Sequence, residues 1–514
     1  MSVALPIKLK APLWWLALLI VCAAGAATVW YASAWGVGVS PDSAEYLAGA
    51  RRLHSLGDLF RLPTQWPPGY PILLKLASLF GGDLYATTRV LQCLLMAGNL
   101  AVAMSLLRHV IGRDSLLPIA GGLVLAASYT LWQVNFYAWS EGPFVLCQQL
   151  SALWLLHALE APVERRWLFA AAGMAALALL FRYAGVAWVG TASLLLLLLT
   201  AGNWRQRLRP AVTFGVVAVA PFAVWIVANK LVRNETTNRQ MVIHWITGSD
   251  ALALLREITS WFGSAQGLLP FVIGAGLVYA VLRSALRNWS RLPQPLRLFV
   301  TISAAYVACY TLFIVLSKSL FDAYIPFDDR IFVVAWLFAV LALTACALQL
   351  FVTGEKHQRT LAVLTVLFFI IIGGSQLLPV MSAARQQGMG YLSAYMSQVS
   401  PVGQLRQLTG RIVYSNAPDY LRMTTDFTAH DYPRKYDPTT MLVNAGLRDE
   451  LATMQRNVQR GDALIVHYQG FEWREYFLSK EELLQLGYQE IIEGNGVDIL
   501  SFPAQVPDKA AAAQ

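Results

Sequence analysis

The chain has 514 residues, of which 57% are hydrophobic and only 13% are charged, and its mean hydropathy is +0.50. One globular core cannot bury so much apolar surface, so the composition excludes an ordinary soluble protein and favours a membrane protein. The net charge of +9 is spread over short loops between apolar segments, which argues against nucleic acid as a partner. The five cysteines lie in apolar segments without a CxxC pair, so we expect neither a disulfide framework nor a cysteine metal site.

Apolar segments of about 20 residues predict a mainly α-helical membrane bundle with about eleven spans. The segment 168–201 is long enough for two short spans that meet at Arg182. The predicted spans are residues 12–35, 84–107, 115–134, 142–160, two within 168–201, 210–231, 267–282, 298–316, 331–352 and 360–380. Residues 1–380 therefore form the predicted transmembrane domain.

A polar loop with two carboxylates, Asp42 and Glu45, follows the first span. Ser40 or Ser43 can cap a helix there, because a serine hydroxyl satisfies a free backbone N–H group. Helical spacing gives this helix one apolar face, formed by Tyr46, Leu47, Ala50 and Leu53. The loop ends in Trp66-Pro67-Pro68-Gly69-Tyr70-Pro71 and a second short helix to Phe80. We expect both helices to lie at the membrane interface.

Basic residues gather in the loops on one side of the predicted spans, which marks that side and the N-terminus as cytoplasmic. These residues are Lys8, Lys10, Arg108, Arg113, Arg165, Arg166, Arg205, Arg207, Arg209, Arg283, Arg287, Arg291, Arg297, Lys356 and Arg359. The outer side then receives the Asp42 loop, Glu141, Arg182, the region 232–266, the loop around Asp328 and the C-terminal segment. An amphipathic helix is expected over 251–262 in that region.

Residues 381–514 have the pattern of a small soluble α/β domain on the outer side. The expected strands are 411–415, 463–467 and a terminal hairpin, 489–493 with 497–502, around Gly494-Asn495-Gly496. The expected helices cover 447–458 and the residues after the capping box Ser479-Lys480-Glu481-Glu482, as far as Leu486. Residues 507–514 are expected to be disordered.

Several charged residues of the outer side are candidates for substrate binding. Glu141 follows aromatic residues at a span boundary, where it can position substrate or cap a helix. Arg182, beside Tyr183, can hold a lipid phosphate with a bidentate contact or reach toward lipid headgroups. Asp322, Asp328 and Asp329 precede Arg330, which is a better candidate for a phosphate clamp than Lys230 or Arg233.

The order of these short motifs resembles the GT-C superfamily of multispanning glycosyltransferases, in the style of bacterial relatives of protein mannosyltransferases and of the lipid A aminoarabinose transferase. The resemblance covers the first 190 residues best. The motifs that carry it are Asp42-Ser43-Ala44-Glu45-Tyr46, Trp66-Pro67-Pro68-Gly69-Tyr70-Pro71, Ser140-Glu141 and Arg182-Tyr183.

The resemblance implies a polyprenyl-phosphate sugar as donor and a glycan, lipid or protein hydroxyl as acceptor, with transfer and inversion at the outer face of the bacterial inner membrane. It makes Asp42 the catalytic base. The residues expected to bind substrate are Glu45, Tyr46, Tyr70, Glu141, Arg182, Tyr183 and Arg330. Protein mannosyltransferases carry paired Asp and Glu in this loop, whereas Ser43 follows Asp42 here. The role of Glu45, and a divalent cation held by Asp42 and Glu45, therefore stay open.

Two other functions compete with this enzyme. A transporter or flippase of a lipid-linked saccharide would place polar and broken-helix elements at the middle of the membrane, often in inverted repeats. Here the polar groups gather at the outer ends of spans and no repeat is evident. An assembly scaffold or sensor would explain the C-terminal domain, but not the outer carboxylates and arginines. The pattern favours the glycosyltransferase.

Overall fold

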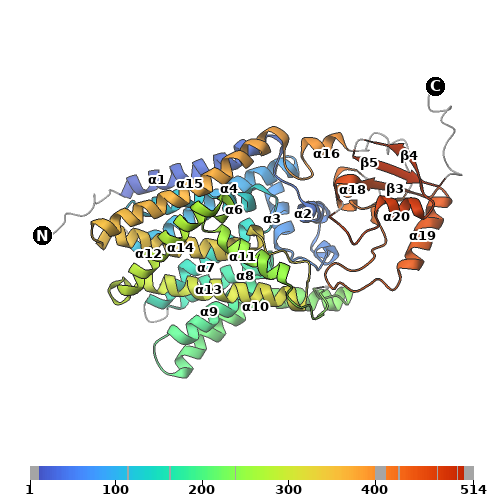
Figure 1. Cartoon of the computed structure of the whole chain (residues 1–514). Coiled ribbons are helices and arrows are strands. Elements are labelled where there is room, and N and C mark those ends of the chain that lie inside the picture. Colours follow the sequence, from blue (N-terminus) through green and yellow to red (C-terminus); the bar gives the residue numbers. More distant parts are fainter. Residues whose placement is uncertain are drawn as a thin grey trace.

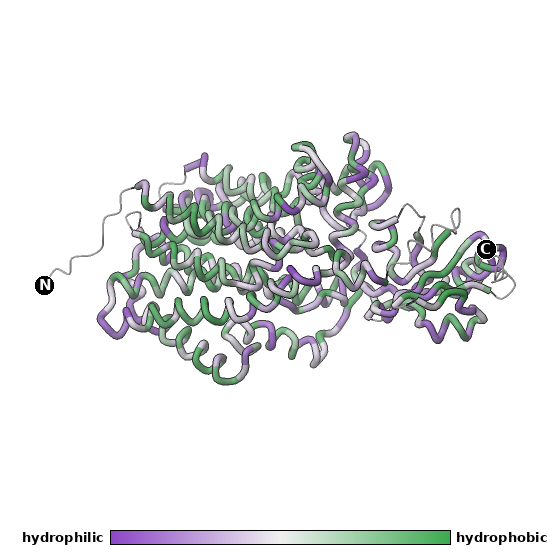
Figure 2. Tube along the Cα trace, turned by 90° about the horizontal axis from the view of Figure 1, so that it is seen from above, coloured by the Kyte–Doolittle hydropathy of each residue, from purple (hydrophilic) through white to green (hydrophobic). Residues whose placement is uncertain are grey.

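The computed structural model describes residues 11–112, 115–160, 164–237, 239–399, 412–425, 429–471, 473–494 and 496–502. A bundle of helices forms the larger part of the molecule and a small sheet with short helices forms the rest, and the first described helix begins at the end of the bundle far from the sheet (Figure 1). Hydrophobic residues run along the helices of the bundle (Figure 2). Lys8, Lys10, Arg113, Arg411, Asn495 and 507–514, on which predictions were made, lie outside the described residues.

Eight of the described helices are long and apolar enough to cross a membrane. They are α1 (Ala11–Ala32), α4 (Leu84–Ile111), α7 (Glu141–Glu160), α10 (Trp204–Arg233), α12 (Leu268–Arg287), α13 (Gln294–Leu320), α14 (Asp329–Thr353) and α15 (Lys356–Gln387). These spans confirm a helical, multi-pass membrane protein. Helix α14 is the most deeply buried of the eight and forms the centre of the bundle. The number of eleven spans stays a prediction, because the remaining helices of the bundle are shorter.

The shorter bundle helices come in two pairs. α8 (Arg165–Phe181) and α9 (Gly185–Leu199) are separated at Arg182, where the sequence predicts the turn. The segment 115–134, predicted as one span, is instead divided into α5 (Pro118–Ala126) and α6 (Tyr129–Phe136). The Ser128 hydroxyl causes a new helix to begin there, because it accepts a hydrogen bond from the Leu131 N–H at 3.2 Å and so caps α6.

The loops at the sheet end of the bundle contain three further α-helices, α2 (Pro41–Arg52), α3 (Gly69–Ser78) and α11 (Gly248–Ser260), all at predicted positions. The described helices of the bundle are also joined by short 3-10 turns, η1 (Ser33–Trp35), η2 (Leu56–Arg61), η3 (Ser264–Gln266) and η4 (Trp289–Arg291). Ser40 is the N-cap of α2 and accepts a hydrogen bond from the Ser43 N–H at 3.4 Å. The apolar face of α2 packs into one core with α3 and with residues of the C-terminal domain, including Tyr420, Tyr468 and Phe471.

Within the described residues, the C-terminal domain contains a five-stranded mixed sheet with the order β2-β1-β3-β5-β4. The strands are β1 (Ile412–Ser415), β2 (Ala429–Asp431), β3 (Ala463–Tyr468), β4 (Gln489–Glu493) and β5 (Val497–Ser501). β1 pairs in parallel with β2 and β3, whereas β5 is antiparallel to β3 and β4. The helical elements are α16 (Ala394–Gln398), α18 (Pro418–Thr424), α19 (Leu447–Gln459), η5 (Gln469–Phe471) and α20 (Lys480–Gln485). The hairpin and the capping box at Ser479 occur as predicted, whereas β2 and α18 were not predicted.

A buried ion pair within this domain is hydrogen-bonded to Tyr391, in the segment that follows α15. Arg474 contacts Asp419 at 2.9 Å, and the Tyr391 hydroxyl donates a hydrogen bond to the same carboxylate. Burial by itself would raise the pKa of Asp419, but Arg474 and Tyr391 together lower it below the usual value. Tyr391 also donates its backbone N–H to the Val39 carbonyl, at 2.7 Å. The ion pair therefore lies beside Gly38 and Val39, the strand-like segment that leads into α2.

We expect Asp419→Asn to lower the free energy of unfolding by about 3–5 kcal/mol, because it leaves the buried Arg474 guanidinium without its counter-charge. Since the folded pKa of Asp419 is lowered, this contribution is present above the ordinary aspartate pKa and is lost as the pH falls through the folded value. Denaturant unfolding of the detergent-solubilised protein measures both effects. Asp431→Asn, which breaks the exposed pair with Arg434, is the control and should cost less than about 1 kcal/mol.

Candidate functional site

Four charged side chains from distant parts of the sequence meet where the bundle faces the C-terminal domain. The Arg330 Nη2 donates to Asp42 Oδ2 at 2.6 Å, and its Nε donates to Glu141 Oε1 at 2.5 Å. Glu141 also forms an ion pair with Arg182. The result is a chain of alternating charges, Asp42, Arg330, Glu141 and Arg182, which we call the charge cluster. Its members come from the first turns of α2, α7 and α14 and from the residue after α8.

The charge cluster balances two carboxylates against two guanidinium groups, which is the condition under which charges are tolerated away from water. The Glu141 side chain is 1% exposed and lies between the two arginines. Asp42 is 28% exposed, more than the side chains of Arg330 and Arg182, at 20% and 19%. Asp42 is therefore the most accessible member of the cluster, and Glu141 fixes the positions of the two arginines.

Backbone pairing fixes the position of α2 and so of Asp42. The Gly38 N–H donates to the Phe136 carbonyl at 3.2 Å, and the Gly38 carbonyl accepts from the Ala138 N–H at 2.9 Å. On its other side this segment pairs with the residues after α15, through Val39 and Gly390. Two elements that are remote in sequence therefore hold the strand-like segment immediately before the helix cap.

Trp139 links the cap of α2 to the charge cluster. Its indole Nε1 donates to the Ser40 hydroxyl at 2.7 Å, and the Arg330 guanidinium lies over its ring at 4.2 Å from the centroid. Such a cation–π contact restrains the guanidinium and leaves its N–H groups for carboxylate or phosphate oxygens. Sequence reasoning gave no role to Trp139. The only signal was its place among aromatic residues two positions before Glu141.

Tyr46 and Tyr70 line the same region from α2 and α3. Their rings pack edge to face with centroids 5.2 Å apart, and Trp66 packs on Tyr46 at 5.9 Å. The Tyr46 hydroxyl lies 3.3 Å from the Ser140 hydroxyl. Burial, followed by the Asp42 carboxylate, raises the pKa of Tyr46 far above its usual value, so this phenol is a neutral hydrogen-bonding group. Both tyrosines support the charge cluster from the side of α2.

Gly69 explains why the Trp-Pro-Pro-Gly-Tyr-Pro motif contains a glycine. A Cβ atom at this position would lie 2.5 Å from the Leu180 carbonyl oxygen, in the last turn of α8. The backbone of α3 can approach α8 this closely only because residue 69 has no side chain.

We expect Gly69→Ala to push α3 away from the end of α8, displace the nearby Arg182 and lower the free energy of unfolding by about 1–3 kcal/mol. Thermal unfolding in detergent checks the stability. Gly173→Ala, within α8, is the control, because its Cβ would meet nothing within 4 Å.

Two further residues predicted to bind substrate, Tyr183 and Glu45, have their hydrogen-bond partners away from the charge cluster. The Tyr183 hydroxyl donates to the Thr64 carbonyl at 2.8 Å, so this side chain joins α8 to the first outer loop. The Glu45 Oε1 accepts a hydrogen bond from Arg422 of α18 at 2.9 Å. Glu45 thus faces the C-terminal domain one helical turn after Asp42. Its partner Arg422 has no local sequence signal, because 377 residues separate the two.

Three other charged residues of the outer loops have partners outside the charge cluster. Arg233 donates to the Phe60 and Leu62 carbonyls, at 3.2 and 2.8 Å, and therefore anchors the first outer loop. Asp328 caps α14 by accepting from the Ile331 N–H at 2.9 Å. Asp322 pairs with Arg239 at 2.5 Å. Of the two arginines considered for a phosphate clamp, Arg330 pairs with Asp42, whereas Arg233 binds these loop carbonyls.

A divalent cation between Asp42 and Glu45 stays a prediction. Each of these carboxylates has an arginine partner, Arg330 for Asp42 and Arg422 for Glu45. Within the described part of the chain, one group of side chains lies close enough to hold a metal: His109, His157 and Glu160. Glu160 is the last residue of α7, about 30 Å along the helix from Glu141.

No family model matches the sequence, and no curated protein matches it. Several solved structures match this chain in fold. ArnT from Cupriavidus metallidurans bound to undecaprenyl phosphate matches with a TM-score of 0.57 at 16% identity, over 97% of this chain and 99% of that chain. Its apo state matches with a TM-score of 0.59 at 14% identity, over the same shares of the two chains.

Two larger proteins match as well. The archaeal oligosaccharyltransferase AglB from Archaeoglobus fulgidus, in complex with an inhibitory peptide and a dolichol-phosphate, has a TM-score of 0.51 at 11% identity, over 97% of this chain and 75% of that chain. The arabinofuranosyltransferase AftD from Mycobacteria has a TM-score of 0.57 at 13% identity, over 98% of this chain and 40% of that chain. These likenesses show the GT-C fold and confirm the fold class predicted from sequence.

Proposed function

We propose that this chain, which has the GT-C fold, transfers a sugar from a polyprenyl-phosphate donor to an acceptor hydroxyl at the outer face of the bacterial inner membrane. The observation that carries the proposal is the charge cluster, in which the accessible carboxylate of Asp42 lies against the guanidinium of Arg330. Two structural neighbours support this class of donor, because ArnT was solved with undecaprenyl phosphate and AglB with a dolichol-phosphate.

Asp42 is the catalytic base of the proposed reaction. The acceptor oxygen attacks the anomeric carbon of the sugar and forms the new glycosidic bond, while the bond from that carbon to the phosphate oxygen breaks. The acceptor proton passes to the Asp42 carboxylate, and the electron pair of the broken bond leaves with the polyprenyl phosphate. A single attack opposite the leaving group inverts the anomeric configuration. A positioned general base contributes about 10²–10⁴-fold to such a rate.

Arg330 and Arg182 stabilise the departing phosphate. Its negative charge grows as the bond breaks, and fixed guanidinium groups in a site shielded from water lower the energy of that charge. Asp42 and Glu141 each accept a hydrogen bond from one nitrogen of the Arg330 guanidinium group. A donor phosphate competes with Asp42 for Arg330, because both are anions and Asp42 is the more exposed carboxylate. Donor binding would therefore release an Asp42 oxygen to accept the proton.

The position of the charge cluster supports the outer face as the site of transfer. Arg165 begins α8, at the opposite end of that helix from Arg182. Arg205 lies in the first turn of α10, at the opposite end from Arg233, which contacts the loop after α2. An excess of Lys and Arg in these loops supports a cytoplasmic position for that side. The cluster also lies at helix ends rather than at mid-helix, which favours a transferase over a transporter.

The test uses the purified chain in lipid nanodiscs loaded with radiolabelled polyprenyl-phosphate sugars, with bacterial envelope fractions as acceptor. We expect label to move from the lipid to an acceptor fraction. If no label moves, while liposomes containing the protein carry the lipid-linked sugar across their bilayer, the transferase proposal fails and the chain is a flippase.

A further inference from the structure

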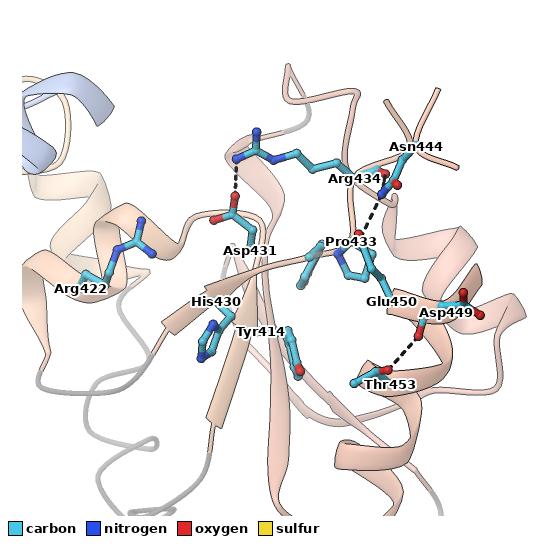
Figure 3. A pocket seen from close by; sticks show the side chains of 11 residues that line it. Tyr414, Arg422, His430, Asp431, Pro433, Arg434, Asn444, Asp449, Glu450 and Thr453 are labelled. Carbon is cyan, nitrogen blue, oxygen red and sulfur yellow. Dashed lines mark hydrogen bonds and ion pairs between the residues drawn. The ribbon is translucent and has the colours of Figure 1, made fainter. Parts of the chain in front are cut away.

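We propose that the C-terminal domain binds the acceptor, an uncharged saccharide chain, in a groove beside the parallel strands β1 and β2. This inference rests on the proposed transfer reaction and identifies its second substrate. The groove has a volume of about 760 Å³. Figure 3 shows Arg422 on one side of it and Asn444, Glu450 and Thr453 on the other, with Tyr414 and His430 on the strands between. This volume is large enough for several sugar rings.

The chemistry of the lining suits a saccharide. Sugar rings present hydroxyls around their edges and C–H groups on their faces, so they need hydrogen-bonding groups and aromatic rings together. Tyr414 and His430 supply two rings with centroids 6.0 Å apart. The Asn444 amide donates to Glu450 at 3.0 Å and offers, with that carboxylate, a hydrogen-bonding wall at the N-terminal end of α19.

The charges of the lining argue for an uncharged ligand. Two arginines line the groove, and each already has a carboxylate partner: Arg422 pairs with Glu45 at 2.9 Å, and Arg434 pairs with Asp431. Asp449 and Glu450 add two more negative charges. Among the residues that the structure describes here, no cation is left over for a phosphate or carboxylate of the ligand. An anionic acceptor would be repelled.

Two sets of contacts link the groove to the segments that carry Asp42 and Arg330. Arg422 lines the groove and binds Glu45, which lies one helical turn after Asp42. A smaller cavity of about 380 Å³ shares Arg434 and Asn444 with the groove and reaches Gln240, in the segment after α10. The Thr439 carbonyl of that cavity's rim accepts a hydrogen bond from the Ala323 N–H, at 2.9 Å. The segment from Ala323 leads into Arg330, so the groove and the smaller cavity are linked by contacts to both segments that carry Asp42 and Arg330.

The test measures binding of the purified, full-length chain in nanodiscs to an array of immobilised oligosaccharides with uncharged, carboxylate-bearing and phosphate-bearing members. We expect binding to uncharged members. His430→Ala and Glu450→Ala, both exposed on the groove, should weaken it by about tenfold or more. Arg460→Ala, exposed beyond the far end of α19, is the control and should bind as the unaltered chain does.

Binding to charged members alone, no binding to any uncharged member, or equal binding by the His430→Ala and Glu450→Ala variants would each overturn the inference. Thermal unfolding of both variants separates lost contacts from lost folding. Saccharide binding without sugar transfer by the unaltered chain would refute the proposed function and leave the groove assignment standing. Sugar transfer without saccharide binding would refute the groove assignment and leave the proposed function standing.

Discussion

Replacing Asp42 by asparagine is expected to lower the rate of sugar transfer by about 10²–10⁴-fold. Asparagine keeps the size of the side chain and can still accept a hydrogen bond from Arg330, so α2 and the charge cluster should keep their geometry. It cannot take the acceptor proton. The measurement compares single-turnover rates from a labelled polyprenyl-phosphate sugar, with donor affinity determined separately on the same samples.

Asp83→Asn is the matched control for this experiment. Asp83 caps α4 by accepting from the Tyr85 and Ala86 N–H groups at 3.0 and 3.1 Å, and asparagine caps helices about as well as aspartate. Its transfer rate should stay unchanged. A transfer rate for Asp42→Asn within twofold of the unaltered chain would remove Asp42 from the chemistry and direct attention to Glu45 or Glu141.

Replacing Arg330 by lysine is expected to lower transfer by about 10²–10³-fold, although the positive charge is kept. One guanidinium contacts both Asp42 and Glu141 through separate nitrogens, and it lies over the Trp139 ring. A lysine ammonium is a single point charge and cannot reproduce this planar, two-sided contact. The loss should be seen in kcat more than in the donor KM, because the departing phosphate gains charge in the transition state.

Arg385→Lys is the control, because Arg385 makes a comparable contact with the Tyr31 ring and carbonyl at the end of α15, away from the charge cluster. An Arg330→Lys variant with unchanged kcat would show that the guanidinium has no role in the transition state. Arg182 would then be the remaining candidate for the phosphate contact.

The sequence predicted most of the helices because their signals are local. Apolar runs of spanning length, the serine cap before Asp42 and the capping box at Ser479 each determine structure within a few residues. The division of 115–134 into α5 and α6 was missed, because the apolar run continues through the cap at Ser128. Strand β2 is only three residues long, too short to give an alternating pattern.

The partners of the candidate residues could not be predicted. Asp42, Glu141, Arg182 and Arg330 were each selected from their own motif, but their pairing depends on how α2, α7, α8 and α14 pack. Tyr183 and Glu45 were selected in the same way, and packing turns them toward Thr64 and Arg422. A short motif therefore indicates which residue types are present, while the tertiary fold determines which of them share a site.

The most direct test of the account is a structure of the unaltered chain with undecaprenyl phosphate bound. We expect the phosphate to contact Arg330, with Asp42 displaced from that guanidinium and turned toward the C-terminal groove. A phosphate bound away from Arg330 and Arg182, with the contact between Asp42 and Arg330 unchanged, would contradict the assignment of the charge cluster as the site of transfer.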